Sequence, residues 1–199
     1  MTRTNFAIER LLATALEAVE RGGVDLISAL EALDAPIYLT DPNGVVTYFN
    51  KACVEFAGRV PLVGKDRWCV TWRLYTDDGA FLPHDQCPLA VAIRTRKPIR
   101  GVTAFAERPD GTRVQFMPYP TPIIGDDGEI LGAVNLLIDV TDERQIEDFR
   151  RQAERCRRLA AAVDDRRAAT ALRRMAAEYD DKAAALNLSQ DATTGDGRI

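Results

Sequence analysis

Short runs of β-branched and aromatic residues alternate with turn-forming tetrapeptides over the first two thirds of the chain. Three of these turns have nearly the same composition: Asp41-Pro42-Asn43-Gly44, Arg108-Pro109-Asp110-Gly111 and Gly125-Asp126-Asp127-Gly128. Proline, Asn or Asp, and Gly suit the backbone angles of tight turns between antiparallel strands. The first turn predicts a hairpin of residues 36–40 and 45–49. The other two share a strand and predict a three-stranded meander over residues 101–140.

Apolar residues recur at helical spacing around these strands. The spacing predicts an N-terminal helix over residues 5–21, a short helix over 25–33, a helix over 51–57 that Asn50 caps and Gly58 ends, and a helix over 85–96 that Asp85 caps. Residues 71–82 are rich in bulky side chains and contain the turn Asp77-Asp78-Gly79, which indicates a small inserted hairpin.

Prolines occupy every second position in the middle strand of the meander, at Pro118, Pro120 and Pro122. Alternate N–H groups of a strand point to the same edge, so all the missing donors lie on one side. We therefore expect a continuous ladder with residues 129–139, through Met117, Tyr119 and Thr121. The opposite edge should separate from the first meander strand beyond Met117.

The last third of the chain is helical and charged. Thr141 is expected to cap a helix whose apolar positions follow alternating steps of three and four, as in a coiled-coil seam: Ile146, Phe149, Ala153, Cys156, Ala160 and Val163. Asp164-Asp165 interrupt this pattern, and a second periodic stretch follows through Leu172, Met175, Tyr179 and Leu186. One long helix and a helical hairpin both fit, with the hairpin favoured. Residues 189–199 are polar and are expected to be disordered.

Composition narrows the class of protein. The 199 residues, 46% hydrophobic and 28% charged, suit one globular domain with helical extensions. A net charge of -4 gives no reason to expect nucleic-acid binding, and no apolar run is long enough to span a membrane. The N-terminus lacks the features of a secretion signal, and the four cysteines are not paired in spacing. These features indicate a cytoplasmic protein with reduced, buried cysteines.

The order of these elements resembles the PAS domain family. The run from Gly132 to Arg144, which contains Asp139-Val140-Thr141, looks like the final PAS strand and its linker, and Glu107 to Thr112 looks like the turn before the fourth strand. The resemblance covers residues 26–144, about six-tenths of the chain. We divide the chain into an N-terminal amphipathic helix (1–25), a PAS domain (26–141), a helical C-terminal extension (142–188) and a disordered tail (189–199).

The resemblance implies an α+β fold: a five-stranded antiparallel sheet with helices on one face, flanked by the N-terminal helix and by a C-terminal coiled coil or helical hairpin. It also implies a bacterial type of signalling protein that forms a homodimer, and the N-terminal helix supplies the interface candidates Leu12, Leu16 and Val19. PAS modules pass a signal from the last strand into the exit helix. The residues in that position here are Asp139, Thr141, Ile146 and Phe149.

A cavity in such a fold could hold a small molecule. The candidate lining residues are mostly bulky, with one amide in an apolar strand: Trp68, Trp72, Tyr75, Ile93, Asn135 and Leu137. If the last strand alternates as in related domains, Asn135 and Leu137 face the cavity. Simple core packing is the alternative for the aromatic residues, and an internal hydrogen bond is the alternative for Asn135.

No cofactor is indicated by a specific motif. His84, the single histidine, is a weak haem or metal candidate near Cys87, but it precedes the helix that carries the ligand in haem-binding PAS sensors. The stretch around Cys69 lacks the flavin-binding pattern of related photosensors. No histidine follows His84, so a phosphoacceptor is absent, and neither a phosphate loop nor a catalytic triad is present.

These observations favour a non-enzymatic signalling module that acts by protein–protein interaction, as a homodimer or by docking on a separate kinase or regulator. A small molecule could modulate that interaction. The alternative is a receptor whose primary event is the capture of a small molecule or haem. Pairs of arginines at 157–158, 166–167 and 173–174 could bind an acidic partner, although interleaved acids favour an ordinary solvated helix face.

Overall fold

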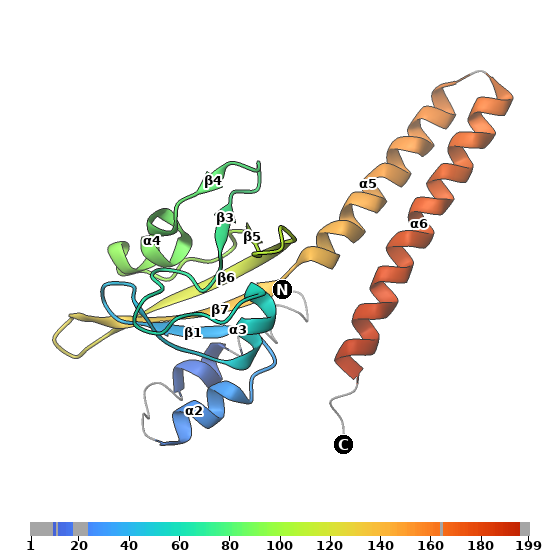
Figure 1. Cartoon of the computed structure of the whole chain (residues 1–199). Helices are drawn as coiled ribbons and strands as arrows, with labels where there is room; N and C mark the ends of the chain where they lie inside the picture. The colour runs from blue at the N-terminus through green and yellow to red at the C-terminus, as the bar shows by residue number, and fades with distance from the viewer. Residues whose placement is uncertain (1–9, 11, 18–23, 164, 196–199) are drawn as a thin grey trace. The chain divides into compact units, whose positions relative to one another are not determined.

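The structure is a computed structural model that describes residues 10, 12–17, 24–163 and 165–195. The chain divides into two compact units, Met1–Asp139 and Val140–Ile199. The first unit contains an antiparallel sheet with helices on both of its faces, and the second is a pair of helices (Figure 1). Each unit is described by itself.

Seven strands form the sheet of the first unit. They are β1 (Ile37–Thr40), β2 (Val46–Phe49), β3 (Arg73–Tyr75), β4 (Phe81–Leu82), β5 (Ala104–Glu107), β6 (Arg113–Ile124) and β7 (Ile130–Asp139), in the order β2-β1-β7-β6-β5-β3-β4. The five predicted strands are present, but the strand count was wrong. The predicted inserted hairpin forms β3 and β4, and β3 pairs with β5 from Arg73 opposite Glu107 to Tyr75 opposite Phe105. The insertion therefore extends the sheet by two strands.

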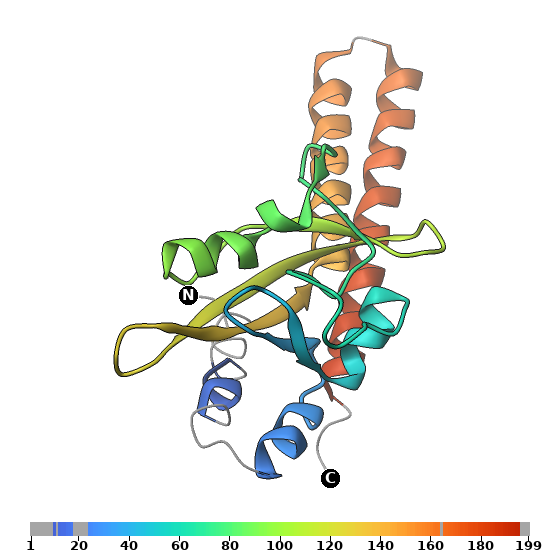
Figure 2. The same ribbon diagram turned by 60° about the vertical axis from the view of Figure 1, so that its left-hand side comes forward.

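The sheet separates two apolar clusters. On one face, α3 (Lys51–Ala57) and α4 (Pro88–Thr95) cover a core that includes Phe56 and Phe116, whose rings meet edge to face at 5.4 Å. On the other face, the described residues of the first helix and α2 (Val24–Glu31) pack on the sheet (Figure 2). Val134 and Leu136 point to this second cluster, whereas Ala133 and Leu137 point to the first. Helices therefore cover both faces, and not one face as predicted.

Local sequence explains most helix ends. Asn50 accepts a hydrogen bond from the Cys53 amide at 3.3 Å and caps α3, and Gly58 ends that helix with φ of 63°, as predicted. Asp85 does not cap α4. It lies in the 3₁₀ turn His84–Gln86, and Cys87 is the N-cap because Pro88 takes the first helical position. A residue before proline is held in an extended conformation, so the helix cannot begin earlier.

The alternate prolines of β6 act as predicted. β6 pairs with β7 along residues 116–124, whereas its pairing with β5 ends where Ala104 lies opposite Phe116. Beyond that point, Pro120 accepts hydrogen bonds at its carbonyl from the Ile99 amide at 3.3 Å and from the Arg100 guanidinium at 3.0 Å. The missing donors therefore end the ladder on one edge only.

The second unit is a helical hairpin of α5 (Thr141–Ala162) and α6 (Arg166–Gly195), which decides between the two predicted alternatives. Its seam combines the predicted Ala153, Cys156 and Ala160 with three alanines of α6 at seven-residue spacing: Ala169, Ala176 and Ala183. The predicted seam residue Met175 is instead 44% exposed, because the small alanines allow the helices to approach along another stripe.

Both ends of the hairpin differ from the prediction. Val140, and not Thr141, is the N-cap of α5, and no side chain caps this end by a hydrogen bond. The backbone of α6 continues past Ser189, where a disordered tail was expected, because neither Gly nor Pro interrupts the chain before Gly195.

Candidate functional site

A chain of buried polar groups crosses the inner face of the sheet. The register of β1 and β7 places Tyr38 opposite Asn135, and both are almost fully buried, at 0% and 2% exposure. The Asn135 amide nitrogen donates to the Tyr38 hydroxyl at 2.9 Å, and that hydroxyl donates to the backbone carbonyl of Trp68 at 2.9 Å. These hydrogen bonds therefore link the last strand to the first strand and to the loop before β3.

Electrostatics fix the direction of these hydrogen bonds. Burial, assisted by Cys69 and Cys87 nearby, raises the pKa of Tyr38 well above its ordinary value. The phenol therefore keeps its proton, which it uses toward Trp68, and its oxygen accepts from Asn135. Burial also raises the pKa of Cys69, and it raises the pKa of Cys87 to about 12. Both thiols therefore stay protonated at neutral pH and act as small apolar groups.

Two buried oxygen atoms at this place have no partner in the described part of the chain. They are Oδ1 of Asn135 and Oγ1 of Thr40, which is 4% exposed and lies two residues beyond Tyr38 on the same face of β1. Most buried polar atoms in folded proteins are hydrogen-bonded, so an unpartnered amide oxygen requires an explanation. Its chemistry suits a hydrogen-bond donor from a small molecule or a water.

Asn50 shows how an amide of purely structural role is satisfied in the same unit. Its Oδ1 accepts from the Ile37 and Cys53 amides at 3.0 and 3.3 Å. Its Nδ2 lies 3.0–3.2 Å from three backbone carbonyls, those of Leu30, Leu33 and Ala35. The amide of Asn135 is equally buried but uses only its nitrogen. The two residues therefore differ in their environment and not in their burial.

Trp68, whose carbonyl accepts from Tyr38, is held in an uncommon backbone conformation. Its φ is 69°, a region that costs about 1–3 kcal/mol for a residue with a bulky side chain. Its amide donates to the Gly44 carbonyl at 2.7 Å, and its ring lies so close to Gly44 that a Cβ there would be 2.1 Å from the ring. This arrangement directs the Trp68 carbonyl toward Tyr38.

The other predicted pocket residues divide into two groups. Ile93 and Leu137 are buried in the same core cluster as Tyr38, and Trp68 packs against it. Trp72, however, is 51% exposed, and Tyr75 lies on the opposite face of β3 from the buried Leu74, with the Arg113 guanidinium 3.8 Å from its ring centre. These two aromatic residues were assigned to the pocket wrongly, because the parity of a three-residue strand is not visible in an irregular stretch of sequence.

His84 is half-buried at the start of the 3₁₀ turn, and its Nε2 has no hydrogen-bond partner in the described part of the chain. Burial and the nearby Arg59 lower its pKa, against the opposing effect of Asp66 and Asp85. The described residues contain no cluster of three or more His, Cys, Asp and Glu side chains that could hold a metal ion.

The dimer candidates of the N-terminal helix contact their own chain. Leu12 is 3% exposed and packs with Tyr119, Val134 and Leu136, and Leu16 packs against the same cluster. These two residues therefore belong to the core in this structure and are not exposed for a second copy. Val19 lies outside the described residues.

The predicted transmission residues lie at the join of the two units. Asp139 ends β7 and Thr141 begins α5, so only Val140 separates strand from helix. On α5, Ile146 is 4% exposed, and Phe149 stacks on Tyr179 of α6 with ring centres 6.1 Å apart. A single residue therefore separates the strand that carries Asn135 from the helical hairpin along the chain.

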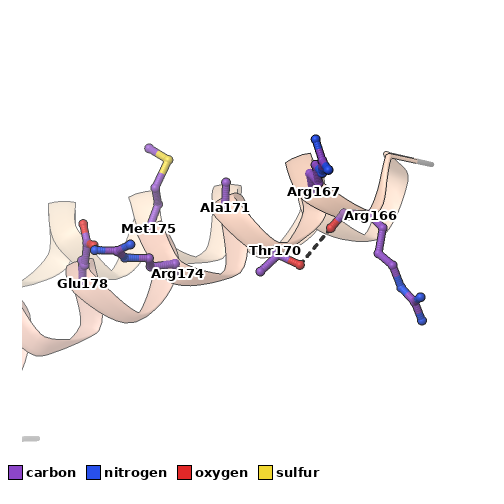
Figure 3. Close-up of a pocket in the computed structure, with 7 residues that line it drawn as sticks. All are labelled: Arg166, Arg167, Thr170, Ala171, Arg174, Met175 and Glu178. Carbon is purple, nitrogen blue, oxygen red and sulfur yellow. Dashed lines mark hydrogen bonds and ion pairs between the residues drawn. The ribbon is translucent and has the colours of Figure 1, made fainter.

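The hairpin carries surface hollows of its own. One, of about 630 Å³, is lined entirely by α6: Arg166, Arg167, Thr170, Ala171, Arg174, Met175 and Glu178. Figure 3 shows Ala171 and Met175 pointing to the same side of the helix, with Arg166 pointing away. Because one helix supplies every wall, this hollow is an open surface and lacks the enclosure of a ligand pocket.

Tyr38 and Thr40 were missed as site residues. Their alternation in the first strand was visible, but their position opposite Asn135 depends on the pairing of the first strand with the last. Sequence spacing alone does not show which strands are neighbours.

Solved PAS and LOV domains are similar in structure to this chain. The chain is similar in structure to a PAS domain from Colwellia psychrerythraea (17% identity, TM-score 0.39, covering 57% of this chain and 92% of that one). It is similar to the PAS domain of the fruit-fly ELK potassium channel (13%, TM-score 0.44, 60% and 98%) and to the LOV domain of a blue-light-activated histidine kinase from Erythrobacter litoralis EL346 (20%, TM-score 0.43, 55% and 98%).

A comparison with curated protein sequences finds no match. None of the helices in the described ranges is both long and apolar enough to cross a membrane. The sequence profile described as PAS domain matches residues 34–142, which is 109 of the 199 residues. The matched range begins just before β1 and ends at the start of α5, and it includes the whole sheet with the Tyr38–Asn135 chain. The chain belongs to the PAS domain family, whose members are sensory and signalling modules.

Proposed function

We propose that this protein is a non-enzymatic PAS signalling module that acts by protein–protein association, with the α5–α6 hairpin as its output surface. The observation that carries the proposal is the join of β7 to α5 through Val140 alone, a residue only 8% exposed. We expect a shift or rotation of the strand to reach the helix, because a single residue separates them. The partner is a second copy of the chain, or a separate kinase or regulator.

The hairpin is built to move as one body. Alanines on both helices permit close contact along the seam, and the Phe149–Tyr179 stack adds an aromatic pair across it. An ion pair joins Arg157 of α5 to Asp180 of α6, and Lys182 lies over both rings, 5.7 and 5.5 Å from their centres. A displacement at the start of α5 would therefore reach the far end of the hairpin.

Photo-crosslinking tests this proposal in the native host. A benzophenone amino acid placed at the exposed Arg158 or Ala171 should give adducts heavier than the 22.0 kDa chain. The same group at Leu131, 58% exposed near the start of β7, serves as the control for random collisions. Adducts from the control position alone, or from no position, would contradict an output surface on the hairpin.

A second candidate function is ligand capture, and the unpartnered Asn135 Oδ1 and Thr40 Oγ1 favour it. A small molecule that donates a hydrogen bond to Asn135 would act on β7 four residues before the strand ends, about 13 Å from Asp139 along the strand. Binding would then be coupled to the hairpin through the same strand. Haem or a metal has less support, because His84 lies outside this cluster and the described residues show no metal-binding group.

Native mass spectrometry tests ligand capture. Protein purified from its host without added cofactor should carry a reproducible excess mass that is lost on denaturation. The variant Asn135→Val removes both polar atoms of the side chain and should lose the excess. A wild-type mass equal to that of the bare polypeptide would mean that no small molecule is captured.

A further inference from the structure

One side of the hairpin is apolar and exposed. Leu159 of α5 and Val163, the C-cap of that helix, are 49% and 37% exposed, and Met175 of α6 is 44% exposed. Positions three or four apart share a face of a helix. That spacing joins Leu159 to Val163, and Met175 to Leu172 and Tyr179. We call the following set the apolar face: Phe149, Leu159, Val163, Leu172, Met175 and Tyr179.

The stack of Phe149 on Tyr179 shows that the two helices contribute to the same side. The other side of the hairpin is polar. It carries the Arg157–Asp180 ion pair and a hollow of about 400 Å³ between Ala161 of α5 and Ala177 of α6, with Arg173 at its border. The exposed apolar residues are therefore concentrated on one side, which is typical of a helix pair that packs on another surface.

Charge is also distributed unevenly, along the length of the hairpin. The loop end, residues 155–175, has seven arginines and two aspartates, a net charge of +5. The open end has a net charge of -5, because residues 141–154 have three arginines and five acids, and residues 176–195 have one lysine and four acids. Five arginines of the loop end have no ion pair in the described part of the chain: Arg155, Arg158, Arg166, Arg167 and Arg173.

We infer that a second copy of the chain covers the apolar face, with the two hairpins antiparallel so that the loop end of each lies against the open end of the other. This inference rests on the proposed function and names its partner. A two-fold axis across the centre of the apolar face makes the face complementary to itself, and it brings the basic loop end of each copy toward the acidic open end of the other. Parallel hairpins would instead bring the two positively charged loop ends together, and these would repel each other.

A nucleic acid fits this surface less well. It would gain from the arginines of the loop end but would meet the negative open end and would leave the apolar side chains in water. A second hairpin satisfies all three features at once. The product is a four-helix bundle in which the apolar face becomes the core.

The size of the face sets the strength of the dimer. Residues 149–163, which run along α5 to its C-cap, extend about 22 Å. Two adjacent helices are about 20 Å wide, so each copy contributes roughly 450 Å². A standard interface uses about 800 Å² per partner. We therefore expect a weak, reversible dimer whose population can respond to a small displacement of α5.

Sedimentation velocity of the full chain tests this inference, at about 1 to about 200 μM and at low and high salt. The wild type should dimerise as concentration rises. The variant Leu159→Glu/Met175→Glu should dimerise at least about tenfold more weakly while keeping the wild-type circular dichroism. The control Ile124→Glu/Leu131→Glu introduces the same charge at residues that are 48% and 58% exposed in the first unit, and it should behave as the wild type.

Two measurements test the antiparallel arrangement, even if the double glutamate variant fails to fold. Raising the salt concentration should weaken the dimer, because it screens the attraction between unlike ends. Arg166→Glu/Arg173→Glu changes the loop end from +5 to +1 and should also weaken it. Tighter association in either case would indicate loop end against loop end and would overturn the arrangement.

A wild type that stays monomeric at all concentrations would overturn the inference, whether or not it binds nucleic acid or packs this face on its own first unit. So would a Leu159→Glu/Met175→Glu variant that dimerises normally. The crosslinking result remains separate: adducts to a different protein, with no dimer in solution, would retain the proposed function and reject the second copy as its partner.

Discussion

Replacing Tyr38 or Asn135 should change the stability of the first unit in opposite directions, although the two residues share a hydrogen bond. Tyr38→Phe removes a hydroxyl that accepts from Asn135 and donates to Trp68. Both of those buried groups then lose a partner. Asn135→Val also breaks the shared bond, but it removes the unpartnered Oδ1 in the same step.

The magnitudes follow from the cost of unpaired polar groups. A buried polar group without a partner costs about 1–3 kcal/mol, and a typical hydrogen bond contributes about 0.5–1.5 kcal/mol. For Tyr38→Phe, the Asn135 nitrogen is left unpaired and the Trp68 carbonyl keeps only the weak Cys87 Sγ donor at 3.7 Å. We expect a loss of about 2–3 kcal/mol. For Asn135→Val, the gain from removing Oδ1 exceeds the lost bond, and we expect about 1 kcal/mol of added stability.

Urea unfolding followed by tryptophan fluorescence measures both effects, because the two tryptophans of the chain, Trp68 and Trp72, lie in the first unit. With a slope of about 2 kcal/mol/M, the midpoint should fall by about 1 M for Tyr38→Phe and rise by about 0.5 M for Asn135→Val. Tyr48→Phe is the matched control. Its hydroxyl donates to Glu31 at an exposed position, so its midpoint should shift by less than about 0.3 M.

One result would refute this reasoning. If Asn135→Val lowers the midpoint in protein that native mass spectrometry shows to be free of ligand, then Oδ1 has a partner, such as an ordered water, that contributes to stability. If the same loss occurs only in ligand-loaded protein, the missing partner is the ligand itself.

Three further expectations concern other parts of the first unit. A Cβ at Gly132 would lie 2.1 Å from the Thr40 carbonyl oxygen, so Gly132→Ala should lower the thermal midpoint by about 10 °C, and a shift below about 2 °C would contradict that contact. The pKa of His84 is lowered in the folded state, so unfolding takes up a proton, and the free energy of unfolding should fall as pH drops below about 6.5. His84→Gln should remove this part of the pH dependence of stability. A variant with the pH profile of the wild type would refute the role of His84. The thiols of Cys53, Cys69 and Cys87 are buried with raised pKa, so maleimide at pH about 8 should label them only after unfolding, and rapid labelling of the native chain would contradict this burial.

Local chemistry was enough to predict many elements of the fold. Turn tetrapeptides located the hairpins, Asn50 and Gly58 bounded α3, and the alternate prolines of β6 predicted which of its edges would lack a ladder. These features depend on a few neighbouring residues whose backbone preferences are strong. The helical hairpin was favoured over one long helix because Asp165 can cap a new helix, and its carboxylate does accept from the Arg167 amide at 2.7 Å.

The predictions that were wrong depended on contacts between residues that are distant in the sequence. Trp72 and Tyr75 were assigned inward because their strand is too short for its alternation to be read. Leu12 was assigned to a dimer because an apolar stripe does not show whether the same chain or another covers it. The importance of Tyr38 became visible only with the pairing of β1 and β7, which brings together residues 97 positions apart.

The alternate prolines of β6 also limit how other proteins can bind the sheet. Binding by strand addition requires a row of free N–H groups along an edge. The edge of β6 beyond Phe116 lacks donors at Pro118, Pro120 and Pro122, and its Pro120 carbonyl is already bound by residues 99 and 100. In the part of the chain that the structure describes, the short outer strands β2 and β4 remain as edges of the sheet. This edge of the long central strand is therefore protected against fibril-like pairing, and a partner that binds here must recognise side chains and not backbone.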